Sequence, residues 1–140
     1  MKTLKIFLLI FSIVFTFTLT SCSTTLRFLN SSVVPAAKGS VKVSKDDNNN
    51  YAIQVKITNL AEPERLQPKK ELYVVWLVTE DQITKNIGRL NSTSSFFSDA
   101  LEGQLSTVSS FKPDHFFITA EDNSSIQYPT GTVVLTTKSN

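Results

Sequence analysis

Between residues 39 and 58, hydrophobic side chains recur at every second position. Val41 and Val43 alternate with polar residues, and the same alternation returns over residues 51–58. Successive side chains of a strand point to opposite faces, so this period is typical of strands with one buried face. The polar segment 46–50 lies between the two runs and is rich in aspartate and asparagine, which suit tight turns. The pattern predicts a β-hairpin.

The longest apolar run of the remaining chain, residues 71–79 (ELYVVWLVT), is apolar on both faces. It is rich in β-branched and aromatic residues, which predicts a central strand. Shorter strands are predicted at residues 86–90, 104–110, 115–120 and 132–137, and no segment has a helical period. The fold predicted from this spacing is an all-β, immunoglobulin-like antiparallel β-sandwich of about seven strands.

The N-terminus has a different pattern. Lys2 and Lys5 precede an apolar run over residues 6–20, which is shorter than the roughly 20 residues of a membrane-spanning helix. A positive start and a short apolar run predict a secretory signal peptide. The sequence Leu19-Thr20-Ser21-Cys22 resembles the bacterial lipobox. This resemblance implies cleavage before Cys22 and attachment of a diacylglycerol to its thiol. Cys22 is the only cysteine, so no internal disulfide forms.

The chain therefore divides into a signal peptide (1–21), an acylated cysteine with a tether (22–35) and a sandwich domain (36–140). Residues 23–35 show no sustained period and end in proline, which favours the tether. Alternatively, Leu26, Phe28 and Leu29 pack onto the domain as an edge strand. The pattern leaves both arrangements open.

Charge excludes one class of partner. The chain has 14 Lys+Arg and 12 Asp+Glu, and removal of Lys2 and Lys5 leaves 12 of each. A neutral mature chain without a basic stripe does not indicate nucleic-acid binding. Ser23 follows the predicted anchor, in place of the aspartate that retains some lipoproteins at the inner membrane. We expect outer-membrane attachment facing the periplasm.

Motifs for chemistry are mostly absent from the sequence. The stretch from Asp46 resembles the start of a calcium loop, but Tyr51 stands where that loop needs glycine and Ile57 where it needs glutamate. His115 is the only histidine, which disfavours a zinc site or a Ser-His-Asp relay. We therefore expect no metal, no cofactor and no catalytic activity.

Two aromatic doublets, residues 96–97 and 116–117, indicate a possible surface. In a strand, one ring of each doublet enters the core and the other points away from it. The second ring either packs under a loop or joins an exposed apolar patch, and such patches mark interaction sites. The candidate interaction surface consists of Tyr73, Val75, Leu77, Phe97 and Phe117.

Two segments carry a resemblance to a known family. The strand at residues 73–78 (YVVWLV) and the ending at residues 116–135 (FFITAEDNSSIQYPTGTVVL) resemble the extracytoplasmic domain of anti-sigma-K-type factors. The resemblance covers residues 36–137 and implies a β-sandwich with Trp76 in its core and a turn at residues 129–131. Family members usually carry a cytoplasmic sigma-binding domain and a transmembrane helix, where this chain has the lipobox.

These observations predict a lipid-anchored cell-envelope module that binds an envelope protein partner and is accessory to envelope signalling. The alternative is a lipoprotein that binds a small ligand or glycan in a loop-end pocket lined by Tyr51, Tyr73 or Tyr128. A flat apolar sheet face would favour the protein partner. A hydrolase would require a cleft with clustered titratable groups.

Overall fold

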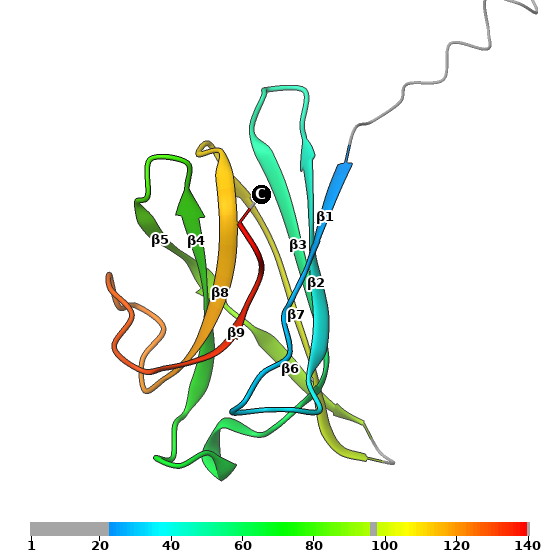
Figure 1. Cartoon of the computed structure of the whole chain (residues 1–140), viewed down its shortest axis with the longest axis vertical. Coiled ribbons are helices and arrows are strands. Elements are labelled where there is room, and N and C mark those ends of the chain that lie inside the picture. The colour runs from blue at the N-terminus through cyan, green and yellow to red at the C-terminus, as the bar shows by residue number, and fades with distance from the viewer. Residues whose placement is uncertain (1–22, 96–97, 140) are drawn as a thin grey trace, which may run out of the picture.

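The computed structural model describes residues 23–95 and 98–139, which form two antiparallel sheets packed face to face (Figure 1). The first sheet has the order β1 (Ser23–Arg27), β2 (Lys38–Lys45), β3 (Tyr51–Leu60), β7 (Ser98–Ser109) and β6 (Asn91–Ser95). The second has the order β5 (Thr84–Arg89), β4 (Leu72–Thr79), β8 (Pro113–Glu121) and β9 (Thr132–Thr136). A short 3-10 helix, η1 (Pro63–Arg65), follows β3. The all-β sandwich is confirmed, with nine strands in the described residues.

The predicted hairpin is present as β2 and β3. Val41 pairs with Val55 and Val43 with Ile53, so the alternating apolar residues of both strands share one face. In the turn, the Asp46 carboxylate accepts hydrogen bonds from the backbone N–H of Asn48 (2.9 Å) and of Asn50 (2.8 Å). The aspartate therefore organises the turn, as expected for this residue type.

The core lies between the two sheets. Its apolar face on the first sheet includes Val41, Ile53, Val55 and Ile57, each at most 1% exposed. Opposite this face, β4 and β8 contribute a second set of buried side chains, which consists of Tyr73, Val75, Leu77, Phe116, Ile118 and Ala120. The doublet at residues 116–117 thus sends Phe116 into this core, as predicted.

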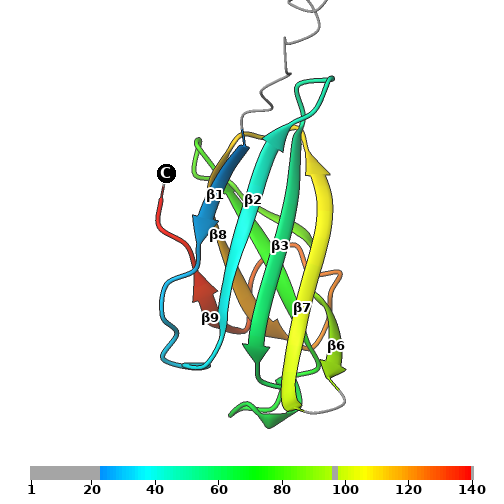
Figure 2. The ribbon, with the colours of Figure 1, turned by 90° about the vertical axis from the view of Figure 1, so that its right-hand side faces the viewer.

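The segment after Cys22 is a strand of the sandwich, so the predicted tether is wrong. Residues 23–27 form β1 at the edge of the first sheet, with Leu26 paired with Val41 (Figure 2). Leu26 and Phe28 pack against the core. A five-residue strand with one inward apolar side chain has too little alternation to be recognised from sequence. The edge-strand alternative is correct for Leu26 and Phe28 but not for Leu29, which is exposed, and the domain begins by Ser23.

β6 was not predicted because its sequence, NSTSS, has no apolar alternation. It pairs only with β7, from Asn91 opposite Gln104 to Ser95 opposite Ser98. The strand predicted over 104–110 is correspondingly longer and begins at Ser98. β6 and the first residues of β7 therefore lie outside the segments in which apolar residues alternate with polar ones.

The sandwich has two ends with different loops. We call the end that holds the start of β1 the proximal end. It also holds the β2–β3 turn, the β4–β5 turn (residues 80–83) and the β7–β8 turn (residues 110–112) (Figure 1). The distal end holds η1 and the start of β4. The register fixes this arrangement, because Ser23 lies opposite Ser44 and Tyr51 opposite Ser109. In the described residues, no helix is long and apolar enough to cross a membrane.

Candidate functional site

The predicted apolar surface on β4 is wrong. Tyr73 is 2% exposed, and Val75 and Leu77 are fully buried, because this face of β4 packs against the first sheet. Both faces of this strand are apolar, so its sequence could not show which face lies inside. Phe97 lies outside the described residues. An exposed apolar sheet face is therefore not available at these three positions.

The fifth residue of that predicted surface, Phe117, lies on the opposite face of the second sheet. Its ring stacks on Trp76, with ring centroids 6.1 Å apart and planes 13° apart. Phe117 is half-buried, whereas Trp76 is fully buried. Trp76 is therefore a core residue of the molecule, but it lies outside the cluster between the sheets. Of the two alternatives for the second ring, packing is the one the structure shows.

A loop over residues 122–131 is held to this outer face by a chain of buried and partly buried hydrogen bonds. Trp76 Nε1 donates to Thr119 Oγ1 (2.8 Å), and Thr119 Oγ1 donates to Glu121 Oε1 (2.7 Å). The Glu121 carboxylate also accepts bonds from the backbone N–H of Thr130 (3.1 Å) and of Gly131 (2.9 Å). Thr130 Oγ1 adds a bond of 2.8 Å to Oε2. The turn predicted at residues 129–131 is thus fastened to the sheet by one carboxylate.

Glu121 is 1% exposed, and a buried acid needs a reason to remain charged. Desolvation by burial raises its pKa, but hydrogen bonds from Thr119, Gly131 and Thr130 outweigh it and lower the pKa overall. The folded state therefore favours the ionised carboxylate of Glu121. All its partners are internal, so Glu121 has a structural role.

A hollow with a volume of about 490 Å³ lies at the distal end. Such a volume falls within the range of small-molecule sites, roughly 300–1,000 Å³. We call it the distal hollow. It lies where η1, the start of β4 and the β5–β6 connection meet, and its walls are Glu62, Pro63, Glu64, Glu71, Leu72, Tyr73, Arg89, Leu90, Asn91, Ser92 and Leu101.

Charge in the distal hollow is predominantly negative. Glu62, Glu64 and Glu71 supply carboxylates, and Arg89 supplies the cation of the lining. Glu62 also pairs with Arg65 (3.0 Å between Oε2 and Nε), an exposed residue just outside the lining. When Arg65 is counted, three acidic residues stand against two basic ones, which leaves a small excess of negative charge at the hollow.

Tyr73 forms the floor of the distal hollow rather than an exposed contact. Its hydroxyl donates a hydrogen bond to the backbone carbonyl of Ala61 (2.9 Å). Burial raises the pKa of Tyr73 from its ordinary value of 10.0 to about 12, so the phenol keeps its proton over a wider pH range. The backbone carbonyl of Tyr73 accepts from the N–H of Leu90 (2.9 Å), which ties the floor to the β5–β6 connection. The hollow is therefore preformed.

The other two tyrosines named for the ligand-binding alternative line different hollows. Tyr128 lies beside a hollow of about 670 Å³ between β5 and the loop, where Asn86 Nδ2 donates to the carbonyls of Ser124 (2.9 Å) and Ile126 (2.8 Å). Tyr51 borders a small cavity of about 110 Å³ at the proximal end. The three residues do not form one site.

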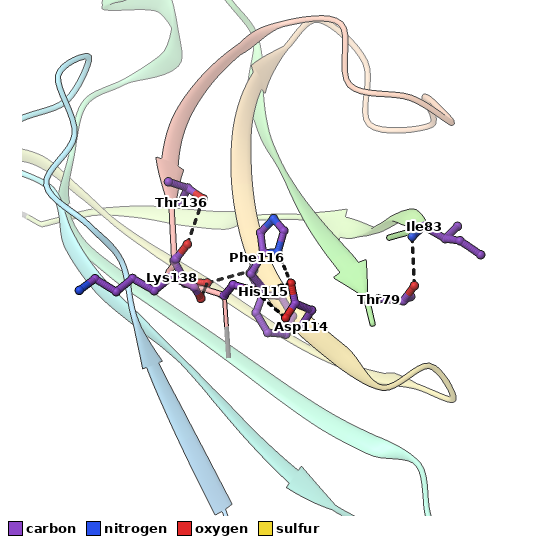
Figure 3. A network of polar contacts seen from close by, with 9 residues as sticks. Thr79, Ile83, Asp114, His115, Phe116, Thr136 and Lys138 are labelled. Carbon is purple, nitrogen blue, oxygen red and sulfur yellow. Dashed lines mark hydrogen bonds and ion pairs between the residues drawn. The ribbon is translucent and has the colours of Figure 1, made fainter. Parts of the chain in front are cut away.

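His115 lies at the proximal end, remote from the distal hollow. Its Nδ1 is 2.8 Å from Asp114 Oδ2, and Asp114 also accepts a bond from Ser139 Oγ (2.7 Å) (Figure 3). In the part of the chain that the structure describes, no group of three or more histidine, cysteine, aspartate and glutamate residues could hold a metal ion.

Comparisons with protein-family models, curated proteins and solved structures returned no match for this chain. The resemblance to anti-sigma-K-type factors therefore stays a prediction. The distal glutamates are the part of the candidate site that the sequence analysis missed. A usable signal exists, because Glu62, Glu64 and Glu71 flank two prolines within one irregular segment.

Proposed function

We propose that this protein is a lipid-anchored, non-catalytic binding module of the bacterial cell envelope, and that the distal hollow takes a small polar ligand bearing an amino group. The observation that carries the ligand site is the hollow itself, with three carboxylates around a cavity of small-molecule size. The anchor is supported by the lipobox-like sequence that ends at Cys22.

Burial of Tyr73, Val75 and Leu77 supports a small ligand over a protein partner. These residues were to form the apolar face on which a protein would dock, and they are at most 2% exposed. Tyr73 instead lines a loop-end hollow, which is the feature expected for small-ligand binding. The elements that line the hollow, η1 and the start of β4, lie at the opposite end of the sandwich from the start of β1, so an anchored domain would hold them away from the membrane (Figure 1).

The clustered carboxylates are also what a hydrolase would need. Two features favour binding. His115 lies at the other end of the sandwich, so Ser92 in the hollow has no histidine base beside it. Glu62 is in addition engaged with Arg65. The carboxylates are therefore assigned to charge recognition.

Calorimetric titration of the purified protein with matched amine probes tests the ligand site. Glucosamine is compared with N-acetylglucosamine, and lysine with its Nε-acetyl derivative, because acetylation converts the charged amine into a neutral amide that carries a small acetyl group. We expect binding of at least one amine and at least tenfold weaker binding of its acetylated form. Tenfold corresponds to about 1.4 kcal/mol, close to the lower limit of roughly 1.5–3 kcal/mol for a hydrogen bond to a charged group.

Variants locate the site. Glu71→Gln and Glu64→Gln should each weaken binding of the amine, whereas Glu102→Gln, an exposed glutamate on β7 outside the hollow, should not. Equal binding of charged and acetylated probes, or equal loss in all three variants, would rule out recognition by these carboxylates. Turnover of a probe that is lost in Glu71→Gln would point to the hydrolase instead.

A further inference from the structure

We propose that the proximal end of the sandwich contacts the lipid bilayer directly, with Phe111 and Ile83 seated in the membrane interface. The proposal rests on the lipid anchor of the proposed function and adds the orientation and the contact surface of the anchored domain. Its occupant is the bilayer in which the acyl chains of Cys22 would lie.

The first step is the distance from the anchor to the fold. β1 begins at Ser23, the residue immediately after Cys22, and its first residue is already paired with Ser44. One residue spans at most about 3.6 Å, whereas each polar headgroup layer of a bilayer is roughly 5–7 Å thick. An acylated Cys22 therefore holds the proximal end within the headgroup layer.

The second step is the position of the turns relative to the start of β1. Thr24 shares the small proximal cavity with Lys112 and Pro113, so the start of β1 lies beside the β7–β8 turn. The β4–β5 turn is bound to the same place, because Glu80 pairs with Lys112 and its N–H donates to the Lys112 carbonyl (3.3 Å). The two turns form one surface next to the anchor.

The third step is what these turns expose. Phe111 is 47% exposed and Ile83 is 48% exposed, and both are large apolar side chains at turn positions. A local bond holds each turn. Phe111 N–H donates to Ser109 Oγ (3.1 Å). Ile83 N–H donates to Thr79 Oγ1 (3.1 Å), as Figure 3 shows. The two exposed apolar side chains therefore stand on turns whose backbone is held in place.

The polar groups around these points suit an interface. The ammonium of Lys85 lies 4.9 Å from the centroid of the Phe111 ring, so the ring can enter the apolar layer while the charge stays among the phosphates. Acidic and basic residues are nearly balanced at this end, with Lys45, Lys85, Lys112 and Lys138 against Asp46, Asp47, Glu80, Asp81 and Asp114. Contact should therefore depend on burial of apolar surface and little on anionic lipid.

The experiment uses the full chain, acylated in a bacterial host and placed in vesicles of phosphatidylethanolamine and phosphatidylglycerol. Acylation consumes the thiol of Cys22, the sole cysteine, so Phe111→Cys supplies one site for an environment-sensitive dye. Lys69→Cys, an exposed position in the distal loops, is the matched control. We expect blue-shifted emission, and quenching by spin-labelled lipid, for the dye at position 111 and neither for the dye at position 69.

A measurement without substitution or dye accompanies this test. Hydrogen exchange of the amides of residues 80–83 and 110–112 should slow in the vesicle-bound protein relative to the Cys22→Ala chain in solution, while residues 66–71 should not change.

The outcomes separate the contact from the anchor. If the protein sediments with vesicles but position 111 reports water and the two turns exchange unchanged, the bilayer contact is wrong and the anchor stands. If the protein does not sediment with vesicles, the anchor is wrong and the contact falls with it. If the blue shift vanishes in vesicles without phosphatidylglycerol, electrostatic attraction holds the turns at the membrane, and the proposed apolar contact is wrong.

Discussion

At the scale of single residues, the loop over residues 122–131 depends on two positions. A Cβ atom on Gly131 would lie 1.8 Å from the carbonyl oxygen of Ala120, so only glycine fits there. The glycine N–H meanwhile donates to the buried carboxylate of Glu121. Gly131 therefore combines a close approach to the backbone of Ala120 with a hydrogen bond to the charged Glu121.

Gly131→Ala should destabilise the fold by about 1–3 kcal/mol, because the added methyl group forces the turn away from β8. Urea unfolding followed by the fluorescence of Trp76 measures this change. Thr132→Ala, at the neighbouring exposed position, should alter the free energy of unfolding by less than about 0.5 kcal/mol. Equal stability of the two variants would mean that the turn does not pack as described.

Glu121→Gln should lower the stability at neutral pH by about 1–3 kcal/mol, since it replaces a carboxylate that accepts several hydrogen bonds. The folded-state pKa of Glu121 lies below the ordinary value of 4.5, so its contribution is present above that value. The contribution is lost as the pH falls through the folded-state pKa.

Unfolding measured from pH 7 to pH 3 should therefore show a steeper acid loss for the wild type than for Glu121→Gln. Glu102→Gln, at an exposed position, should follow the wild-type curve. Parallel curves for wild type and Glu121→Gln would contradict the lowered pKa.

At the scale of elements, β1 decides where the domain begins. Its apolar contribution to the core is the half-buried Leu26, opposite Val41, while its neighbour Thr25 is exposed. This strand covers one edge of the first sheet and links the predicted anchor to the fold without a spacer.

Leu26→Ala should lower the free energy of unfolding by about 1–3 kcal/mol, somewhat less than a fully buried leucine would lose. Thr25→Ala, with its side chain in solvent, serves as the control and should change little. An unchanged urea midpoint for Leu26→Ala would show that residues 23–27 behave as the tether suggested by their sequence.

At the scale of the whole molecule, the start of β1, which follows the predicted lipid anchor in the sequence, and the distal hollow lie at opposite ends of one sandwich. The ligand site would then face away from the membrane while the proximal turns touch it. The link to sigma-factor regulation stays a prediction, because no comparison bears on it.

Cys22→Ala should release the protein from membranes into the soluble fraction, because the acyl chains supply most of the affinity at about 0.8 kcal/mol per buried methylene. Fractionation of cells that express each form measures this. A variant that still sediments with membranes would show that the lipobox interpretation is wrong.

The sequence by itself determined the sandwich, the β2–β3 hairpin and the central position of β4, because each rests on a local period of apolar residues. It left β1 as one of two alternatives and did not reveal β6, because both strands are mostly polar and pairing is their main reason to be strands. It also could not choose the inner face of β4: Tyr73 and Trp76 lie on opposite faces of a run that is apolar on both. Only tertiary packing decided that Tyr73 lies between the sheets and Trp76 under the loop. The distal hollow likewise exists only because the β5–β6 connection meets η1 and the start of β4, which come earlier in the chain, at one end.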